Sequence, residues 1–296
     1  MIEGQEGLNW ERWRRICSDV DSLGFASLRR SDHLISLMND SARDCIECWA
    51  SLAPAAEWTK RIEFGPMVSP MTFRLPGVLA KQAASVDALS GGRLILGVGA
   101  GWNENEHDVF HIAFYTQRER FNNLESGIRL MREAWEKSNP KPARNPIPLL
   151  IGGKGAKRTL PLVAREAAEW NHSTLNADAF RELSATLDRC CQELGRDPRS
   201  IKRSVMTSFI IGRDVSELQD RAARVGQVIP TLRGLNPGQV LDNRRQAWFV
   251  GTPEEIAEQM REYAKLGVDL FMLQHFLLDD SDALRLLAEE VIPSVA

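Results

Sequence analysis

Two periodicities alternate along the chain and predict its secondary structure. Apolar residues spaced by three and four positions indicate amphipathic helices, whereas short apolar runs between polar segments indicate strands. The predicted helices cover residues 10–23, 76–90, 121–135, 157–168, 180–194, 253–266 and 283–291. The predicted strands cover residues 25–30, 61–68, 93–99, 148–151, 169–173, 201–211 and 268–275. Strand and helix alternate, and this α/β order favours a parallel sheet flanked by helices.

The alternation leaves two architectures open. A closed (β/α)₈ barrel and an open doubly wound sheet both repeat the strand–helix unit, and the pattern does not separate them. The segment 213–250 interrupts the rhythm, so we expect an insertion or lid there. The helix after it has the clearest start, with Thr252 as N-cap, Pro253 at the first position and Glu255 completing a capping box.

Composition and charge narrow the class of protein. Of 296 residues, 43% are hydrophobic and 26% are charged, which is typical of a folded globular chain. The formal net charge of −3 argues against general nucleic-acid binding. No apolar run reaches the ~18 residues of a membrane span, and the acidic, polar start is unlike a signal peptide. Five cysteines make no disulfide framework, so we expect a reduced, cytoplasmic protein without a membrane or nucleic-acid partner.

Two glycine-rich segments follow predicted strands. The first, residues 97–101, lacks the last glycine of a dinucleotide-binding fingerprint, because Trp102 occupies that position. Either a tight turn or the close approach of a ligand would explain its glycines. The second contains Gly152, Gly153, Lys154 and Gly155 and precedes a helix, with Lys157 and Arg158 close behind. Free N–H groups and these cations would suit a phosphate, although an ordinary turn is the alternative.

Side chains suited to proton transfer or metal binding are few. Asp32 and His33 follow a strand, where barrel enzymes place catalytic groups, so His33 is a candidate proton carrier and Asp32 its partner; a structural histidine is the alternative. Cys45 and Cys48 lack a second pair, and their surroundings look helical, so we expect core cysteines. The histidines show no metal-ligand spacing, and no metal site is predicted.

Several motifs together resemble a known family. They are the run of residues 75–94, its continuation through residues 96–102 with Glu106, the pieces 24–25 and 31–33, residues 151–155, and the late segment 267–269. In this order they resemble the bacterial luciferase-like monooxygenase superfamily, and most of all its coenzyme F420-dependent oxidoreductases. The resemblance implies one (β/α)₈ barrel domain over residues 1–296 with an insertion region, often a homodimer.

The resemblance also implies a cofactor site and roles for individual residues. A deazaflavin (coenzyme F420) or a flavin (FMN) would lie at the C-terminal ends of the strands, with His33 as proton donor oriented by Asp32. Met67 and Val68 match a strand end with a non-proline cis peptide behind the ring. The loop around the ring matches Ala100, Gly101, Trp102 and Asn105. The phosphate turn matches Gly152, Gly153, Lys154 and Gly155.

The chain departs from the family pattern near its start and in one loop. The segment from Met1 to Gln5 predicts a shortened first strand, with Glu3 and Gln5 at its upper end near the substrate. Trp102 stands where deazaflavin relatives often have Glu. We expect hydride transfer between coenzyme F420 and a small organic substrate. The alternatives are an FMN-dependent monooxygenase that uses oxygen and a non-catalytic cofactor-binding protein.

Overall fold

The structure is a computed structural model that describes residues 1–38 and 40–295. Its strands are β1 (Ser27–Arg30), β2 (Glu63–Pro66), β3 (Ser69–Pro70), β4 (Leu96–Gly99), β5 (Leu149–Gly152), β6 (Glu169–Ser173), β7 (Lys202–Ile211), β8 (Phe249–Gly251) and β9 (Leu270–Gln274). Its longer helices are α1 (Trp10–Ser22), α2 (Cys48–Trp58), α3 (Pro76–Ser90), α5 (Gln117–Lys137), α7 (Ala177–Glu193), α8 (Val215–Val228) and α10 (Pro253–Ala264). The shorter ones are α4 (Glu104–Val109), α6 (Thr159–Glu166), α9 (Pro237–Arg244), α11 (Ser281–Leu286) and α12 (Ile292–Val295).

The strands form a closed ring of parallel neighbours. β3 pairs with β4, and the order continues through β5, β6 and β7 to β9. β1 pairs with β2, which is joined to the chain before β4 by the bridge between Phe64 and Leu94. Met1 and Ile2 close the ring, because Ile2 bridges to Arg30 while Met1 hydrogen-bonds to residues at the end of β9. The barrel prediction is confirmed, and the doubly wound alternative is excluded.

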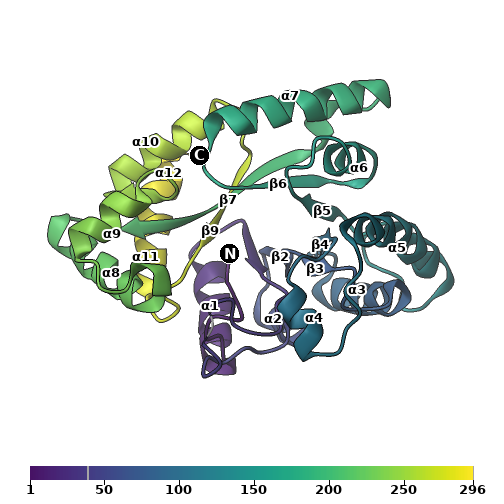
Figure 1. Cartoon of the computed structure of the whole chain (residues 1–296), viewed down its shortest axis with the longest axis horizontal. Coiled ribbons are helices and arrows are strands. Elements are labelled where there is room, and N and C mark those ends of the chain that lie inside the picture. Colours follow the sequence, from purple (N-terminus) through teal and green to yellow (C-terminus); the bar gives the residue numbers. More distant parts are fainter. Residues whose placement is uncertain (39, 296) are drawn as a thin grey trace.

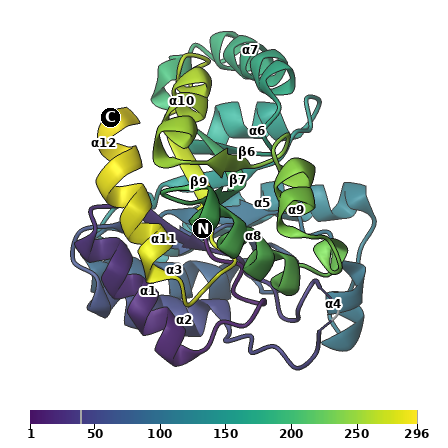
Figure 2. The same ribbon diagram turned by 90° about the vertical axis from the view of Figure 1, so that its left-hand side faces the viewer.

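Helices surround this ring, as Figure 1 shows. All residues of strand β4 are buried, because one face of the strand points into the barrel and the other packs against the surrounding helices. Its glycines permit close contact with the chain after β2: a Cβ on Gly97 would lie 2.1 Å from the Pro66 carbonyl oxygen, and one on Gly99 would lie 2.6 Å from Val68 Cγ2. Gly97 and Gly99 therefore allow the close packing of this strand against residues 66–68, while Gly99 and Gly101 also line the pocket described below. Figure 2 shows α11 lying beside α1 on the outside of the barrel.

The predicted helices and strands are present, with small shifts at their ends. The capping box between Thr252 and Glu255 starts α10 as predicted. The helical surroundings expected at Cys45 and Cys48 overlap only the start of helix α2. The expectation of a helix around Cys45 and Cys48 is partly wrong: Cys48 begins α2 and is buried, whereas Cys45 precedes the helix and bridges to Leu8. No helix in residues 1–38 and 40–295 combines the length and apolar character that a membrane crossing requires.

The segment 213–250 forms α8, a short 3₁₀ turn, α9 and the start of β8. None of its residues lines the main pocket described below. Its role as a lid stays a prediction.

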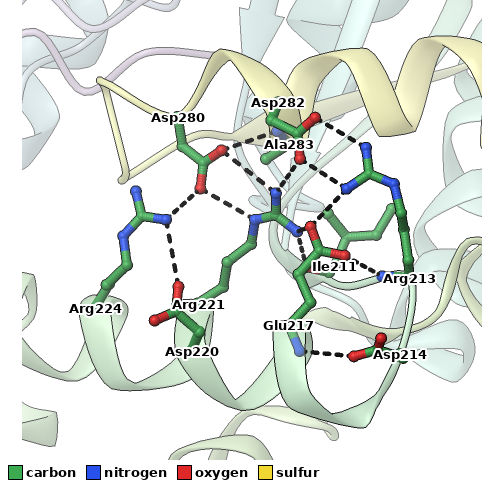
Figure 3. Close-up of polar contacts among 10 residues, drawn as sticks. All are labelled: Ile211, Arg213, Asp214, Glu217, Asp220, Arg221, Arg224, Asp280, Asp282 and Ala283. Carbon is green, nitrogen blue, oxygen red and sulfur yellow. Dashed lines mark hydrogen bonds and ion pairs between the residues drawn. The ribbon is translucent and has the colours of Figure 1, made fainter.

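A network of charged side chains fastens α8 to the chain between β9 and α11 (Figure 3). Buried Arg221 pairs with Asp280 at 3.0 Å, Asp282 at 2.8 Å and Glu217 at 2.8 Å. Asp280 also accepts from Arg224 at 2.8 Å and from the backbone N–H of Ala283, so it caps α11 at the same time. The segment that this network fixes follows directly on Gln274 and Phe276, which face the pocket.

Candidate functional site

A cavity of about 620 Å³ opens at the C-terminal ends of the strands. This volume lies in the usual range for sites that hold a cofactor and a small molecule. The predicted site residues that line it are His33, Met67, Val68, Ala100, Gly101, Trp102, Gly152 and Gly153. The predicted residues outside its lining are Asp32, Asn105, Lys154 and Gly155. The fold therefore brings together predicted residues from four separate parts of the sequence.

The chemistry of the cavity centres on a paired histidine. His33 Nδ1 lies 2.8 Å from Glu106 Oε2, and the backbone N–H of Leu34 donates to Glu106 Oε1 at 2.6 Å. The Glu106 side chain is 1% exposed and that of His33 is 16% exposed. Burial by itself lowers the pKa of His33, but the hydrogen bond and charge of Glu106 outweigh it, so this pKa lies above its ordinary value of 6.5.

The geometry leaves His33 Nε2 for a ligand, because Nδ1 is held by Glu106. The raised pKa favours the imidazolium form near neutral pH, which can donate a proton. The Trp102 ring meets the His33 ring edge-on, with 5.8 Å between centroids, and Trp102 itself is 65% exposed at the rim. An exposed indole at a pocket mouth offers a flat surface to a planar ligand.

The expectation that Asp32 orients His33 is corrected by the structure. Asp32 is buried and accepts two hydrogen bonds from Arg74, at 2.6 and 3.1 Å, and one from the Ser69 hydroxyl at 2.6 Å. Neighbouring residues of an extended chain point to opposite sides, so when His33 faces the cavity Asp32 faces away from it. Asp32 anchors the chain after β3 instead, and the partner of His33 comes from α4.

Apolar side chains make the walls between the polar groups. Met67 and Val68 follow β2, and the peptide bond between them is cis. Together with Ala100, Met206 and Phe276 they border the cavity. Asn105, predicted to contact the ring or its side chain, is exposed on α4, while its neighbour Glu106 points inward. A flat, largely apolar ring system matches walls of this kind.

The turn between β5 and α6 is exposed. Gly153 has a φ of +129°, and a Cβ on Gly155 would lie 2.6 Å from Thr159 Oγ1, so both positions favour glycine. In the described part of the chain, the backbone N–H groups of residues 154–157 meet no acceptor. These groups precede a helix and can bind an anion. The anionic tail of a flavin or deazaflavin therefore fits this turn.

The cations near this turn are not equivalent. Lys154 is exposed and donates to Thr174 Oγ1 at 3.0 Å, and Lys157 is exposed. Arg158, expected beside a phosphate, is instead drawn to α5, where it donates to Asn122 at 2.9 Å and lies over the Phe121 ring. Arg120 lines the cavity from α5, and its Nε donates to the Gly101 carbonyl at 3.1 Å. Arg120 is thus a cation that sequence reasoning missed.

Carboxylates and amides gather on the other side of the cavity. Glu3 lines it and accepts from Gln5 at 2.9 Å and from Gln274 at 2.6 Å. Glu6 also lines it, but is paired with Arg43 at 2.8 Å. The prediction that Glu3 and Gln5 lie near the cavity agrees with this arrangement. Gln274 was missed, since nothing in the sequence distinguishes a polar residue at the end of the last strand from a solvated one.

Comparison with known proteins adds independent information. The family described as luciferase-like monooxygenase matches residues 2–270. An F420-dependent glucose-6-phosphate dehydrogenase from Amycolatopsis mediterranei (strain U-32) is 26% identical, over 93% of this chain and 92% of that protein. An FMNH(2)-dependent dimethylsulfone monooxygenase from Pseudomonas putida is 23% identical, over 67% of this chain and 65% of its own length.

One solved structure illustrates the shared fold. It is an F420-dependent secondary alcohol dehydrogenase in complex with an F420-acetone adduct, and it superimposes with a TM-score of 0.79. The alignment covers 96% of this chain and 94% of that one at 18% identity. At this level of identity the likeness concerns the fold, while function has to be argued from the site.

Proposed function

The chain belongs to the luciferase-like monooxygenase family, and from this premise we propose that it is a coenzyme F420-dependent oxidoreductase acting on a small organic substrate. The observation that carries the proposal is the His33–Glu106 pair inside a cavity whose far side ends at an anion-binding turn. Similarity to an F420-dependent dehydrogenase along nearly the whole chain supports the deazaflavin, whereas the FMN-dependent relative matches about two thirds of it.

Different residues would bind the cofactor tail, exclude water and transfer the proton. A deazaflavin, when bound, supplies a hydride carrier at its C5 position. Residues 154–157 bind the anionic tail through backbone N–H groups, and the apolar walls exclude water from the ring. Glu106 holds His33 and keeps it charged. In its protonated form His33 gives a proton to the substrate oxygen in carbonyl reduction; in alcohol oxidation its neutral form accepts the proton and becomes the imidazolium that Glu106 stabilises.

Titration of the purified protein with coenzyme F420 and, separately, with FMN tests the cofactor assignment. We expect the intrinsic fluorescence of F420 to report micromolar binding, and FMN to bind at least about tenfold more weakly. Preferential binding of FMN, with oxygen consumption in the presence of FMNH₂, would replace the proposal with an oxygen-using monooxygenase. Binding of F420 without turnover on a broad substrate panel would favour a cofactor-binding protein.

The His33→Ala variant tests the proton carrier. We expect F420 affinity to stay within about twofold and turnover to fall about 10²- to 10⁴-fold, which is the usual contribution of general acid–base catalysis. The matched control is His111→Ala, because His111 is exposed and lies outside the cavity lining. Full turnover in the His33 variant would remove this role from His33.

A further inference from the structure

The two sides of the cavity carry opposite charge. Around the ring of strands, β5 is the element farthest from the segment at residues 1–2, which lies between β1 and β9. The β5 side is lined by Gly152, Gly153 and, from α5, Arg120; just beyond this lining lie the free backbone N–H groups of residues 154–157 and exposed Lys154. The side at residues 1–6 presents Glu3 and Glu6. If the anionic cofactor tail binds on the β5 side, the substrate contacts the side formed by residues 1–6.

Of the two carboxylates, Glu3 is the one left for a ligand. Glu6 is already hydrogen-bonded within the protein. It accepts from Arg43, from the Ser36 hydroxyl and from the backbone N–H of Leu37, each at 2.8 Å. For Glu3, no charged nitrogen lies within 4.0 Å anywhere in residues 1–38 and 40–295. Glu3 therefore has no direct ion-pair partner among the described residues, and its charge acts only over a longer range on His33 and on the Met1 ammonium.

A directed hydrogen-bond network holds Glu3 in place. An ionised carboxylate only accepts, so the side-chain amides of Gln5 and Gln274 must turn their NH₂ groups toward it. Their amide oxygens then face hydroxyl donors: Ser31 donates to Gln5, and Ser208 donates to Gln274 at 3.0 Å. Gln5 is 1% exposed, so this network cannot relax into solvent. Each Glu3 oxygen receives one protein hydrogen bond and keeps acceptor capacity toward the cavity.

We propose that Glu3 selects the substrate: it accepts a hydrogen bond from a hydroxyl or ammonium group of an uncharged or cationic alcohol, and it repels phosphorylated or carboxylated analogues. The proposal rests on the proposed function. The reacting hydroxyl would lie at His33, and a second donor on the same molecule would reach Glu3. The relative described above acts on glucose 6-phosphate, a substrate whose phosphate carries a charge of about −1.5 to −2. The cavity wall at Glu3 offers such a group a negative charge instead of a cation.

Three alcohols with one carbon skeleton test this selection. They are trans-4-aminocyclohexanol, trans-1,4-cyclohexanediol and trans-4-hydroxycyclohexanecarboxylate, which differ in charge and little in size. Their affinities for the wild-type protein are measured by calorimetry, with and without F420, and kcat/KM is measured with F420. We expect the aminoalcohol and the diol to bind at least about tenfold more tightly than the carboxylate, because a like charge near Glu3 weakens binding.

Two variants link the preference to Glu3. Glu3→Gln is expected to bring the three affinities within about threefold of one another while F420 affinity stays unchanged. Glu3→Ala removes the charge without adding an amide donor. It replaces Glu3→Gln in the same measurements if Glu3→Gln misfolds. Glu258→Gln, on the exposed face of α10, is the control for a lost surface charge and keeps the wild-type preference.

The outcomes separate the selection from the proposed function. Tighter binding of the carboxylate, no binding of the aminoalcohol and diol, or an unchanged preference in Glu3→Gln would overturn the role of Glu3, even if F420 binds and turns over. Failure of F420 to bind would overturn the proposed function. The binding series without F420 would still decide whether Glu3 selects by charge.

Discussion

The two ends of the cavity are built in different ways. The end at Glu3, His33 and Glu106 consists of side chains that are largely buried and that hold one another by hydrogen bonds. The end at residues 152–157 consists of exposed backbone, with glycines where side chains would collide. A network of buried side chains fixes individual atoms, which proton transfer and substrate selection need. Free backbone N–H groups bind any anion of suitable size, which suits a cofactor tail.

The largest loss is expected from Glu106→Gln, at the side-chain end. The variant keeps the shape but removes the charge that raises the pKa of His33, so turnover should fall about 10²-fold or more. A raised pKa keeps His33 protonated to higher pH. In the variant, the decline of proton-donor activity with rising pH should therefore begin at lower pH. The measurement is kcat against pH for carbonyl reduction.

The matched control for Glu106→Gln is Glu104→Gln on the exposed face of α4. An unmoved pH profile would contradict the role of Glu106.

The next largest effect concerns the support behind Gln274 and Phe276. Asp280→Asn leaves buried Arg221 and half-exposed Arg224 without their shared carboxylate (Figure 3) and should lower the free energy of unfolding by about 3 kcal/mol. Burial alone would raise the pKa of Asp280, but its bonds to Arg221 and Ala283 lower it overall. A lowered pKa stabilises the fold above the unfolded value of about 3.9, and this contribution disappears as the pH falls through the folded value.

Urea unfolding measures this prediction at pH 7 and pH 3. The difference between wild type and Asp280→Asn should shrink at the lower pH. Asp220→Asn is the control, because Asp220 is 68% exposed and pairs with Arg224 at the longer distance of 3.7 Å. Equal losses in both variants would show that the network contributes little to holding the wall of the cavity.

At the backbone end, a methyl group should be enough to disturb binding. In Gly155→Ala the added Cβ would lie 2.6 Å from Thr159 Oγ1, so the turn has to shift and F420 affinity should fall about tenfold, with turnover at saturating F420 nearly unchanged. Gly77→Ala is the control, since a Cβ there meets nothing within 4 Å. A variant that loses kcat while keeping its affinity would show that the turn does not hold the tail.

The smallest effect is expected from Lys154→Met. Lys154 is exposed, so its attraction for an anion is screened by water and salt, and F420 affinity should fall about two- to fivefold at low ionic strength. The difference should vanish near 1 M salt, where the Debye length is about 3 Å. Lys265→Met, an exposed lysine beyond α10, is the control. A larger, salt-independent loss would assign Lys154 a direct, buried contact.

Local patterns predicted most of the elements, and their failures have physical reasons. Helix α2 is rich in Ala and carries few polar residues, so it lacks the contrast between an apolar stripe and a polar face that reveals a surface helix. Cys45 itself bridges to Leu8, a contact between distant residues that no short-range spacing reveals. Glu106 belongs to the family-like motif that continues from residues 96–102, but its role as the partner of His33 depends on α4 turning its buried face toward the cavity.

By itself, the sequence determined the order of strands and helices, the turns that need glycine and the family. These features follow from periodicity and from local backbone preferences, which act within a few residues. Only the tertiary structure decided that the ring is closed through Met1 and Ile2, that Glu106 rather than Asp32 holds His33, and that Glu3 lines the cavity with no direct ion-pair partner among the described residues. Each depends on which side of a strand or helix faces the interior, and on contacts between distant residues, such as Glu3 and Gln274, which lie 271 positions apart.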